Sequence, residues 1–290
     1  MMRNPLRSFV PVLALAFAAG GAGAQAVKPH GDEIYTPQPG QVGKDVMWLG
    51  TPEAMVTAML RAAKTGPNDF VADLGAGDGR IAIAAAKEFG ARAMGIEYDP
   101  KMAALAARNA MREGVFDRVR IVEGDIFKED FSRASVVTLY LLPELNLQLR
   151  PQILAMAPGT RVVSYTFTMA EWEPDETIKG ATFDAYLWTV PAQVAGRWSV
   201  ADESGREVAV ADIDQQFQKI GGTITVAAKA QPLLGAFVAG RELGFSYLDR
   251  DTAFRAVRLT VDADRAAGTS RLGEHELRLT ARRVPHAVRP

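Results

Sequence analysis

The sequence predicts an α/β domain built on a parallel sheet, followed by an antiparallel β domain. Three observations predict this order. From residue 51 to about residue 175, short apolar runs alternate with helix-like segments, as in strands joined by crossover helices. At residues 70–89 a strand, a glycine turn and a helix follow one another directly. Beyond residue 190 the apolar runs are short, β-like and spaced as hairpins are.

The composition excludes several classes of function. The chain has 290 residues, a length that favours two domains, and 48% of them are hydrophobic, which is ample for their cores. Its net charge of -1 offers no basic face, so we expect no nucleic-acid partner. The absence of cysteine excludes disulfides, thiolate metal sites and cysteine nucleophiles. We predict no metal site, because the three histidines lack ligand spacing: His30, His275 and His286.

Residues 1–26 have the pattern of a secretory signal peptide. Arg3 and Arg7 precede an apolar run at 9–19, and small residues at 22–26 offer a cleavage site. The apolar run is shorter than the roughly 20 residues of a membrane-spanning helix. We therefore expect a periplasmic or secreted protein with no stable membrane span after cleavage. The alternative is an uncleaved N-terminus that tethers the protein to the membrane.

An extended arm and a helix precede the first strand. Residues 27–50 are rich in proline, glycine and polar residues and include Tyr35. Thr51 is predicted to cap a helix whose first turn holds Pro52 and Glu53. A helix in this position commonly covers a ligand cleft.

The glycine turn is the stretch on which the first domain depends. An apolar strand at 70–74 precedes it and a helix at 81–89 follows. Glycines at alternate positions allow positive φ and the close approach of a ligand, and the helix start adds free N–H groups. A dinucleotide motif would need a third glycine at Arg80, so a different small polar ligand is expected. The glycines are Gly75, Gly77 and Gly79.

Acidic residues follow the next two strands. The strand at 91–96 ends at Glu97, and Asp99 with Pro100 then starts a helix. The strand at 119–122 is followed by Asp125. The carboxyl ends of neighbouring parallel strands lie at one edge of a sheet, so both side chains are expected beside the glycine turn.

Two more strands complete the predicted sheet. The run at 135–141 is almost continuously apolar, as in a central parallel strand. A helix at 143–156 and a strand at 160–167 follow. The segments after these strands, 140–146 and 166–172, are therefore expected to face the active crevice.

These positions resemble the motifs of class I S-adenosylmethionine (SAM) dependent methyltransferases, whose fold is a Rossmann-like sheet with helices on both faces. The resemblance implies SAM as cofactor, with the glycines beneath its amino-acid end. It also implies that Glu97 binds the ribose hydroxyls and Asp125 the adenine amino group. The implied cofactor-binding residues are Asp73, Gly75, Ala76, Gly77, Gly79, Glu97, Tyr98, Asp125 and Ile126.

A narrower resemblance covers about residues 30–175. This stretch of the chain is similar to bacterial relatives of the mitochondrial lysine methyltransferases that modify the ATP synthase and the adenine nucleotide translocase. The turn after the fourth strand departs from that family, because it begins Tyr-Leu-Leu-Pro without a glycine. The resemblance implies methyl transfer to a protein lysine by in-line displacement. It is carried by Tyr35-Thr-Pro37, residues 73–80, Leu142-Pro-Glu144 and the Phe167 to Pro174 loop.

A lysine acceptor requires a neutral amine, because its ordinary pKa is near 10.4 and the protonated form does not attack. An apolar channel favours the neutral form. Under this hypothesis Tyr35, Tyr140 and Trp172 surround the amine and Glu144 positions it or relays its proton. In the alternative, Tyr140 and Trp172 belong to the core and Glu144 interacts with the helix dipole.

The last hundred residues, 191–290, are predicted to form an antiparallel barrel or sandwich. Short motifs around Trp198 and Gln215 resemble the strand openings of lipocalin-like barrels. We expect a barrel whose interior is filled by side chains and which docks on the first domain and helps recruit the acceptor. The alternative is a ligand pocket inside the barrel. The expected strands are 196–200, 208–212, 223–228, 233–238, 243–248, 253–261 and 275–282.

Two other functions are compatible with these residues. One is a small-molecule methyltransferase with the same cofactor site. The other is a module that binds SAM or another ligand without turnover. The predicted export conflicts with a cofactor that is made in the cytosol.

Overall fold

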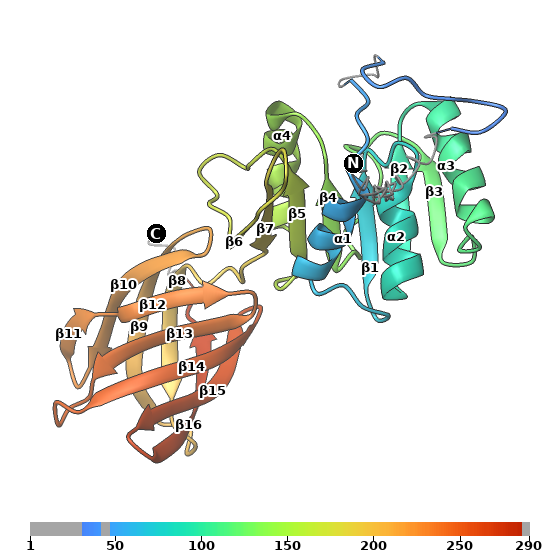
Figure 1. Ribbon diagram of the computed structural model, residues 1–290. Helices are drawn as coiled ribbons and strands as arrows, with labels where there is room; N and C mark the ends of the chain where they lie inside the picture. Colours follow the sequence, from blue (N-terminus) through green and yellow to red (C-terminus); the bar gives the residue numbers. More distant parts are fainter. Residues whose placement is uncertain (1–30, 42–46, 286–290) are drawn as a thin grey trace, which may run out of the picture.

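The computed structural model describes residues 31–41 and 47–285. It has two parts, a mixed α/β part and an antiparallel barrel, which lie side by side (Figure 1). The predicted signal peptide at 1–26 lies outside the described residues. Within the described ranges, no helix has both the length and the apolar character needed to cross a membrane.

The first part contains a seven-stranded sheet in the order β3-β2-β1-β4-β5-β7-β6. The first five strands of this order run parallel, and β7 and β6 continue the sheet antiparallel. This confirms the predicted α/β fold. The strands are β1 (Phe70–Leu74), β2 (Arg92–Glu97), β3 (Val119–Glu123), β4 (Val136–Leu139), β5 (Arg161–Tyr165), β6 (Glu176–Ile178) and β7 (Ala185–Thr189).

Apolar clusters cover both faces of this sheet. One cluster joins β1 and β5 to α1 and α2, and the other joins β1 and β4 to α4. All four residues of β4 are buried, as predicted for a central strand. The helices are α1 (Glu53–Ala62), α2 (Arg80–Phe89), α3 (Pro100–Arg112) and α4 (Pro143–Leu154).

The helix starts differ in how they are capped. At α3 the Asp99 carboxylate accepts the N–H groups of Lys101 and Met102, as predicted. At α1 the N-cap is Pro52 and no side chain caps the helix, so the predicted Thr51 cap is wrong. The Thr51 carbonyl instead accepts a hydrogen bond from Arg80, which ties this segment to the glycine turn.

The second part is a nine-stranded antiparallel sheet in the order β11-β10-β9-β8-β16-β15-β14-β13-β12. The sequence predicted seven strands and missed β11 and β15. Pro232 and Lys229 make β11 an edge strand, and β15 contains small residues of low strand propensity that pairing on both sides compensates. The strands are β8 (Gly196–Ala201), β9 (Glu207–Gln216), β10 (Lys219–Val226), β11 (Lys229–Pro232), β12 (Leu234–Ala239), β13 (Glu242–Leu248), β14 (Phe254–Asp262), β15 (Arg265–Leu272) and β16 (His275–Arg283).

This sheet curls into a nearly closed barrel, which confirms the barrel over the sandwich (Figure 1). The open side is bridged by Gln231 of β11, whose side chain makes two hydrogen bonds to the backbone of Leu248, at 2.6 and 2.8 Å. Buried apolar side chains from the strands, including Trp198 and Phe245, form one interior cluster. The interior is therefore a packed core, as expected for a small barrel.

Candidate active site

A cleft opens at the carboxyl ends of the central strands. Its floor is the turn between β1 and α2, where Gly75 and Gly77 have φ values of +81° and +56°. The position agrees with the rule that open parallel sheets bind ligands at this edge. The lining residues from the sheet and its loops include Asp73, Ala76, Asp78, Ile81, Glu97, Tyr98, Asp99, Met102, Asp125, Ile126, Tyr140, Leu141 and Leu145.

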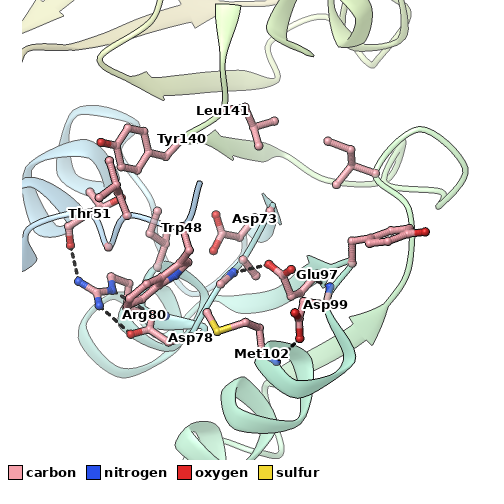
Figure 2. A pocket seen from close by; sticks show the side chains of 18 of the residues that line it. Trp48, Thr51, Asp73, Asp78, Arg80, Glu97, Asp99, Met102, Tyr140 and Leu141 are labelled. Atoms are coloured by element: carbon pink, nitrogen blue, oxygen red, sulfur yellow. Dashed lines mark hydrogen bonds and ion pairs between the residues drawn. The ribbon is translucent and has the colours of Figure 1, made fainter. Parts of the chain in front are cut away.

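Glu97 connects the second strand to the glycine turn. Its Oε2 accepts the N–H of Gly77 at 2.8 Å, and its Oε1 accepts the N–H of Asp99 at 2.9 Å (Figure 2). Burial raises the pKa of Glu97. Each carboxylate oxygen can accept a second hydrogen bond, so Glu97 still offers acceptors to a hydroxyl-bearing ligand.

Asp73 ends the first strand beneath the cleft. Thr138 donates to its Oδ1 at 2.8 Å, whereas the buried Oδ2 has no hydrogen-bond partner among the described residues. Burial raises the pKa of Asp73 to about 7, and the neighbouring charges of Asp78 and Glu97 add to the effect. A buried carboxylate with one unsatisfied oxygen fits a cationic ligand group, such as the amino group of SAM.

Asp125, Ile126 and Tyr98 also line the cleft. The Asp125 Oδ1 accepts the N–H of Phe127 at 3.1 Å, which fixes its orientation after β3. Tyr98 is half exposed and Ile126 partly buried, so both offer an apolar surface at the opening. The structure thus places the three predicted acidic positions around one cleft, and Figure 2 shows two of them, Asp73 and Glu97.

Gly79 is not among the residues that line the cleft, and its predicted contact with the cofactor stays a prediction. A side chain at this position would meet the Cβ of Ala106 on α3 at 3.0 Å. Its φ of +82° provides the left-handed residue that precedes α2. Gly79 therefore provides the backbone conformation of the turn and allows α3 to pack closely against the start of α2.

The four predicted catalytic residues have different placements. Tyr140 lines the cleft and packs edge-on against Tyr165, with ring centroids 4.8 Å apart. Trp172 is fully buried and packs against Trp188, so its predicted place in an acceptor channel is corrected to a core position.

Tyr35 and Glu144 also lie outside the residues that line the cleft. The Tyr35 hydroxyl accepts a hydrogen bond from Gln41 at 2.7 Å, and Gln41 itself reaches the cleft. Glu144 is exposed on the first turn of α4, the placement expected of a carboxylate that interacts with the helix dipole. The predicted roles of both side chains toward the acceptor stay predictions.

Trp48 lines the cleft, a position that the sequence did not predict. Its backbone pairs with Gly40 and Gln41, both at 2.9 Å, so the arm folds back over the glycine turn. A side chain on Gly77 would meet the indole Nε1 at 2.7 Å. An aromatic residue shortly before the predicted helix was the available signal.

Arg80 ties the arm to the glycine turn. Its guanidinium forms an ion pair with Asp78 and donates to the Thr51 carbonyl at 2.8 Å (Figure 2). Gly50 lies against the same guanidinium, where a Cβ would meet Arg80 atoms at 2.5 Å. Arg80, which stands where a dinucleotide motif has its third glycine, therefore holds the arm against the glycine turn.

The cleft is acidic. The residues that line it carry five carboxylates and one guanidinium. No group of three or more histidine, cysteine or acidic side chains in the described part of the chain is arranged to hold a metal ion. This charge favours a cationic ligand over an anionic one.

The fold and this cleft define the chain as a SAM-dependent methyltransferase, and comparisons with known proteins agree. Residues 73–176 match the family model described as the ANTKMT methyltransferase domain. The chain belongs to this family. A protein-lysine N-methyltransferase from Saccharolobus islandicus (strain REY15A) is 44% identical over 136 residues, which are 46% of this chain and 84% of that protein.

Two further relatives extend the comparison. An ATP synthase lysine N-methyltransferase of Xenopus laevis is 38% identical over 46% of this chain and 57% of its own length. A crystal structure described as an RNA methyltransferase from Salinibacter ruber, in complex with S-adenosyl-L-homocysteine, is 46% identical with a TM-score of 0.50. It covers 50% of this chain and 96% of its own. SAM is accordingly the cofactor of this chain.

Proposed function

We propose that this protein transfers a methyl group from SAM to the side-chain amine of a protein lysine. The observation that carries the proposal is the acidic cleft, which ends at Tyr140, Leu141 and Leu145 after the central strand. Two relatives named as lysine N-methyltransferases support this acceptor.

Bound SAM supplies the electrophilic methyl group. The chain's own residues would hold it: Asp73 would offer a carboxylate oxygen to its amino group, and Glu97 would offer acceptors to its ribose. Asp125, which lines the same cleft, would accept from the adenine amino group. Rate acceleration then depends mainly on alignment of the reacting atoms.

The acceptor side of the cleft is apolar. Tyr140, Leu141 and Leu145 line it, and Tyr165 packs behind Tyr140. Desolvation by such side chains lowers the pKa of a lysine from about 10.4 and so favours the neutral amine. The nearby carboxylates attract the cationic lysine before it loses its proton.

RNA is a second candidate acceptor, because the Salinibacter ruber protein is described as an RNA methyltransferase. The charge of the cleft argues against it here. RNA phosphates bind to basic surfaces, whereas five carboxylates line this opening. We therefore favour the protein acceptor.

The experiment incubates the purified protein with methyl-labelled SAM and a cell lysate. Half of each product is treated with protease and half with ribonuclease, and the labelled amino acid is identified after hydrolysis. We expect protease-sensitive label recovered as methyl-lysine. Label in RNA or in small metabolites, or SAM binding without turnover, contradicts the proposal. Asp73→Asn serves as the control for cofactor-dependent label.

We also propose that the protein is exported and acts in the periplasm or outside the cell. The charged, apolar and small-residue regions of 1–26 support this proposal. The test is cell fractionation combined with sequencing of the mature N-terminus. A mature chain that begins at Val27 or nearby, in the periplasmic fraction, is expected. An intact N-terminus in the cytosol would contradict export, and one in the membrane fraction would indicate a tether.

A further inference from the structure

The turn that joins β9 to β10 has a phenylalanine at a position where glycine is favoured. Gln216 pairs with Lys219, so Phe217 and Gln218 form a two-residue turn. Phe217 has a φ of +55°. Glycine is favoured at such a position, since a bulky residue adopts this conformation at a cost. The conformational cost of this residue is expected to be offset by stabilising contacts elsewhere.

Those contacts lie in the methyltransferase part. The Phe217 ring stacks on Trp172, with centroids 6.1 Å apart and planes at 19°. The Arg150 guanidinium of α4 lies 5.5 Å from the centroid of the Phe217 ring. Phe217 thus contacts both α4 and the loop after β5, two segments that are distant from it in sequence.

Polar contacts beside Phe217 reach the same loop. The side-chain amide of Gln218 donates to the Glu173 carbonyl at 2.6 Å and to Asp175 at 3.2 Å. Lys219 forms an ion pair with Glu173 at 2.7 Å. Both ends of that ion pair are exposed, so it contributes little energy. Phe217 supplies the apolar contact, and Gln218 adds the two hydrogen bonds beside it.

The loop that these contacts hold is strained. Thr166 and Ala170 have φ values of +72° and +52°. Three buried polar atoms of this region have no partner in the described structure: Thr166 Oγ1, Asn146 Oδ1 and Trp172 Nε1. Strain of this kind persists where surrounding contacts over-determine the conformation, and it gathers near functional sites.

Helix α4 connects this loop to the cleft. Asn146 donates to the carbonyls of Phe167 and Thr168, both at 3.4 Å. Arg150 donates to the carbonyl of Met169 at 2.9 Å. The residue before Asn146 is Leu145, which lines the cleft at its acceptor side.

We infer that the tip of the β9–β10 hairpin positions the acceptor side of the cleft, with Phe217 as the positioning residue. Through Trp172 and Arg150 it holds the strained loop and α4, and thereby Leu145. The cofactor side is held by other contacts, those of Glu97, Thr138 and Arg80 within the first part of the chain. The assignment of this side to an acceptor rests on the proposed function.

The test uses the full chain with Phe217→Gly, because glycine suits the turn and spares the hairpin itself. The SAM dissociation constant is expected to stay within about twofold of wild type. The acceptor kcat/KM at saturating SAM should fall by at least about tenfold, as misalignment predicts. Phe217→Tyr should retain the acceptor kinetics. Phe254→Gly, which removes an exposed phenylalanine on β14, is the matched control.

Hydrogen exchange provides a readout that does not need the acceptor. Phe217→Gly should speed exchange at 141–147 and 166–174 and leave 75–79 unchanged. Unchanged exchange at 141–147 would overturn the inference, as would an equal loss of SAM affinity and acceptor turnover. If the wild type methylates no lysine but the exchange pattern appears, the proposed function fails and the positioning role stands.

Discussion

The indole Nε1 of Trp48 lies 2.7 Å from the point where a side chain on Gly77 would begin. The two residues come from the N-terminal arm and the glycine turn, and Arg80 holds these segments together. Gly77 is therefore required both for its φ of +56° and for the space that Trp48 occupies. This contact makes the arm part of the cofactor cleft.

Gly77→Ala should weaken SAM binding by at least about tenfold, because the new Cβ collides with Trp48 and strains the turn. Isothermal titration calorimetry measures the affinity. Gly114→Ala is the matched control, since Gly114 also has positive φ, at +71°, but faces open space. Both variants should lose some stability. Normal SAM affinity in Gly77→Ala would contradict this account of the cleft.

Trp48→Ala should weaken SAM binding about three- to tenfold, the range expected for the loss of an aromatic contact. Trp48→Phe should lose less. The other three tryptophans, Trp172, Trp188 and Trp198, are fully buried. A change in tryptophan fluorescence on SAM addition should consequently come from Trp48 and vanish in Trp48→Phe. A fluorescence change that survives this substitution would argue against the contact.

Arg80→Ala should release the arm from the glycine turn. The side chain is largely buried and makes charge-assisted hydrogen bonds, each worth about 1.5–3 kcal/mol. We expect SAM affinity to fall at least about tenfold, with faster hydrogen exchange at 47–51. Arg118→Ala removes an exposed arginine and should change neither quantity. Equal exchange in both variants would refute the link.

SAM affinity should depend on pH through Asp73. Its pKa is raised to about 7, so the carboxylate that attracts the SAM amino group is lost as pH falls through 7. A single group of this pKa makes binding about tenfold weaker at pH 6 than at pH 8. Asp73→Asn should bind SAM weakly at pH 8 and lack this part of the pH dependence. Asp130→Asn, at an exposed position, is the control.

The raised pKa of Asp73 also predicts how the stability of the ligand-free protein changes with pH. Between the ordinary aspartate pKa of about 4 and the folded value of about 7, the folded state holds a proton that the unfolded state has lost. Stability therefore decreases as pH rises through this window. Without SAM, Asp73→Asn should melt at a higher temperature than wild type at pH 8. An identical melting temperature would contradict the buried charge.

Much of the cofactor site was predictable. Asp73 and Glu97 lie at the carboxyl ends of β1 and β2 and Asp125 follows β3, and parallel strands bring their carboxyl ends to one edge. The alternation of strands and helices therefore predicts that these side chains meet. The nine-stranded barrel was less predictable, because β11 and β15 take their conformation from their neighbours.

The acceptor side was not predictable in the same way. Trp172 was expected in an acceptor channel, but it is fully buried. Phe217 stacks on it from the β9–β10 turn, which is distant in sequence. Tyr35 was expected at the cleft, but the arm folds so that Trp48 reaches it. Neither contact leaves a periodic pattern in the sequence, since each joins segments from different elements.

The order of residues along the chain is sufficient to establish the sheet, the glycine turn and its acidic partners, because their geometry follows from local periodicity and from the direction of parallel strands. Which aromatic side chain covers the cofactor, and which hairpin supports α4, depend on packing between distant segments. Those relationships exist only once the arm and the barrel have docked on the first sheet.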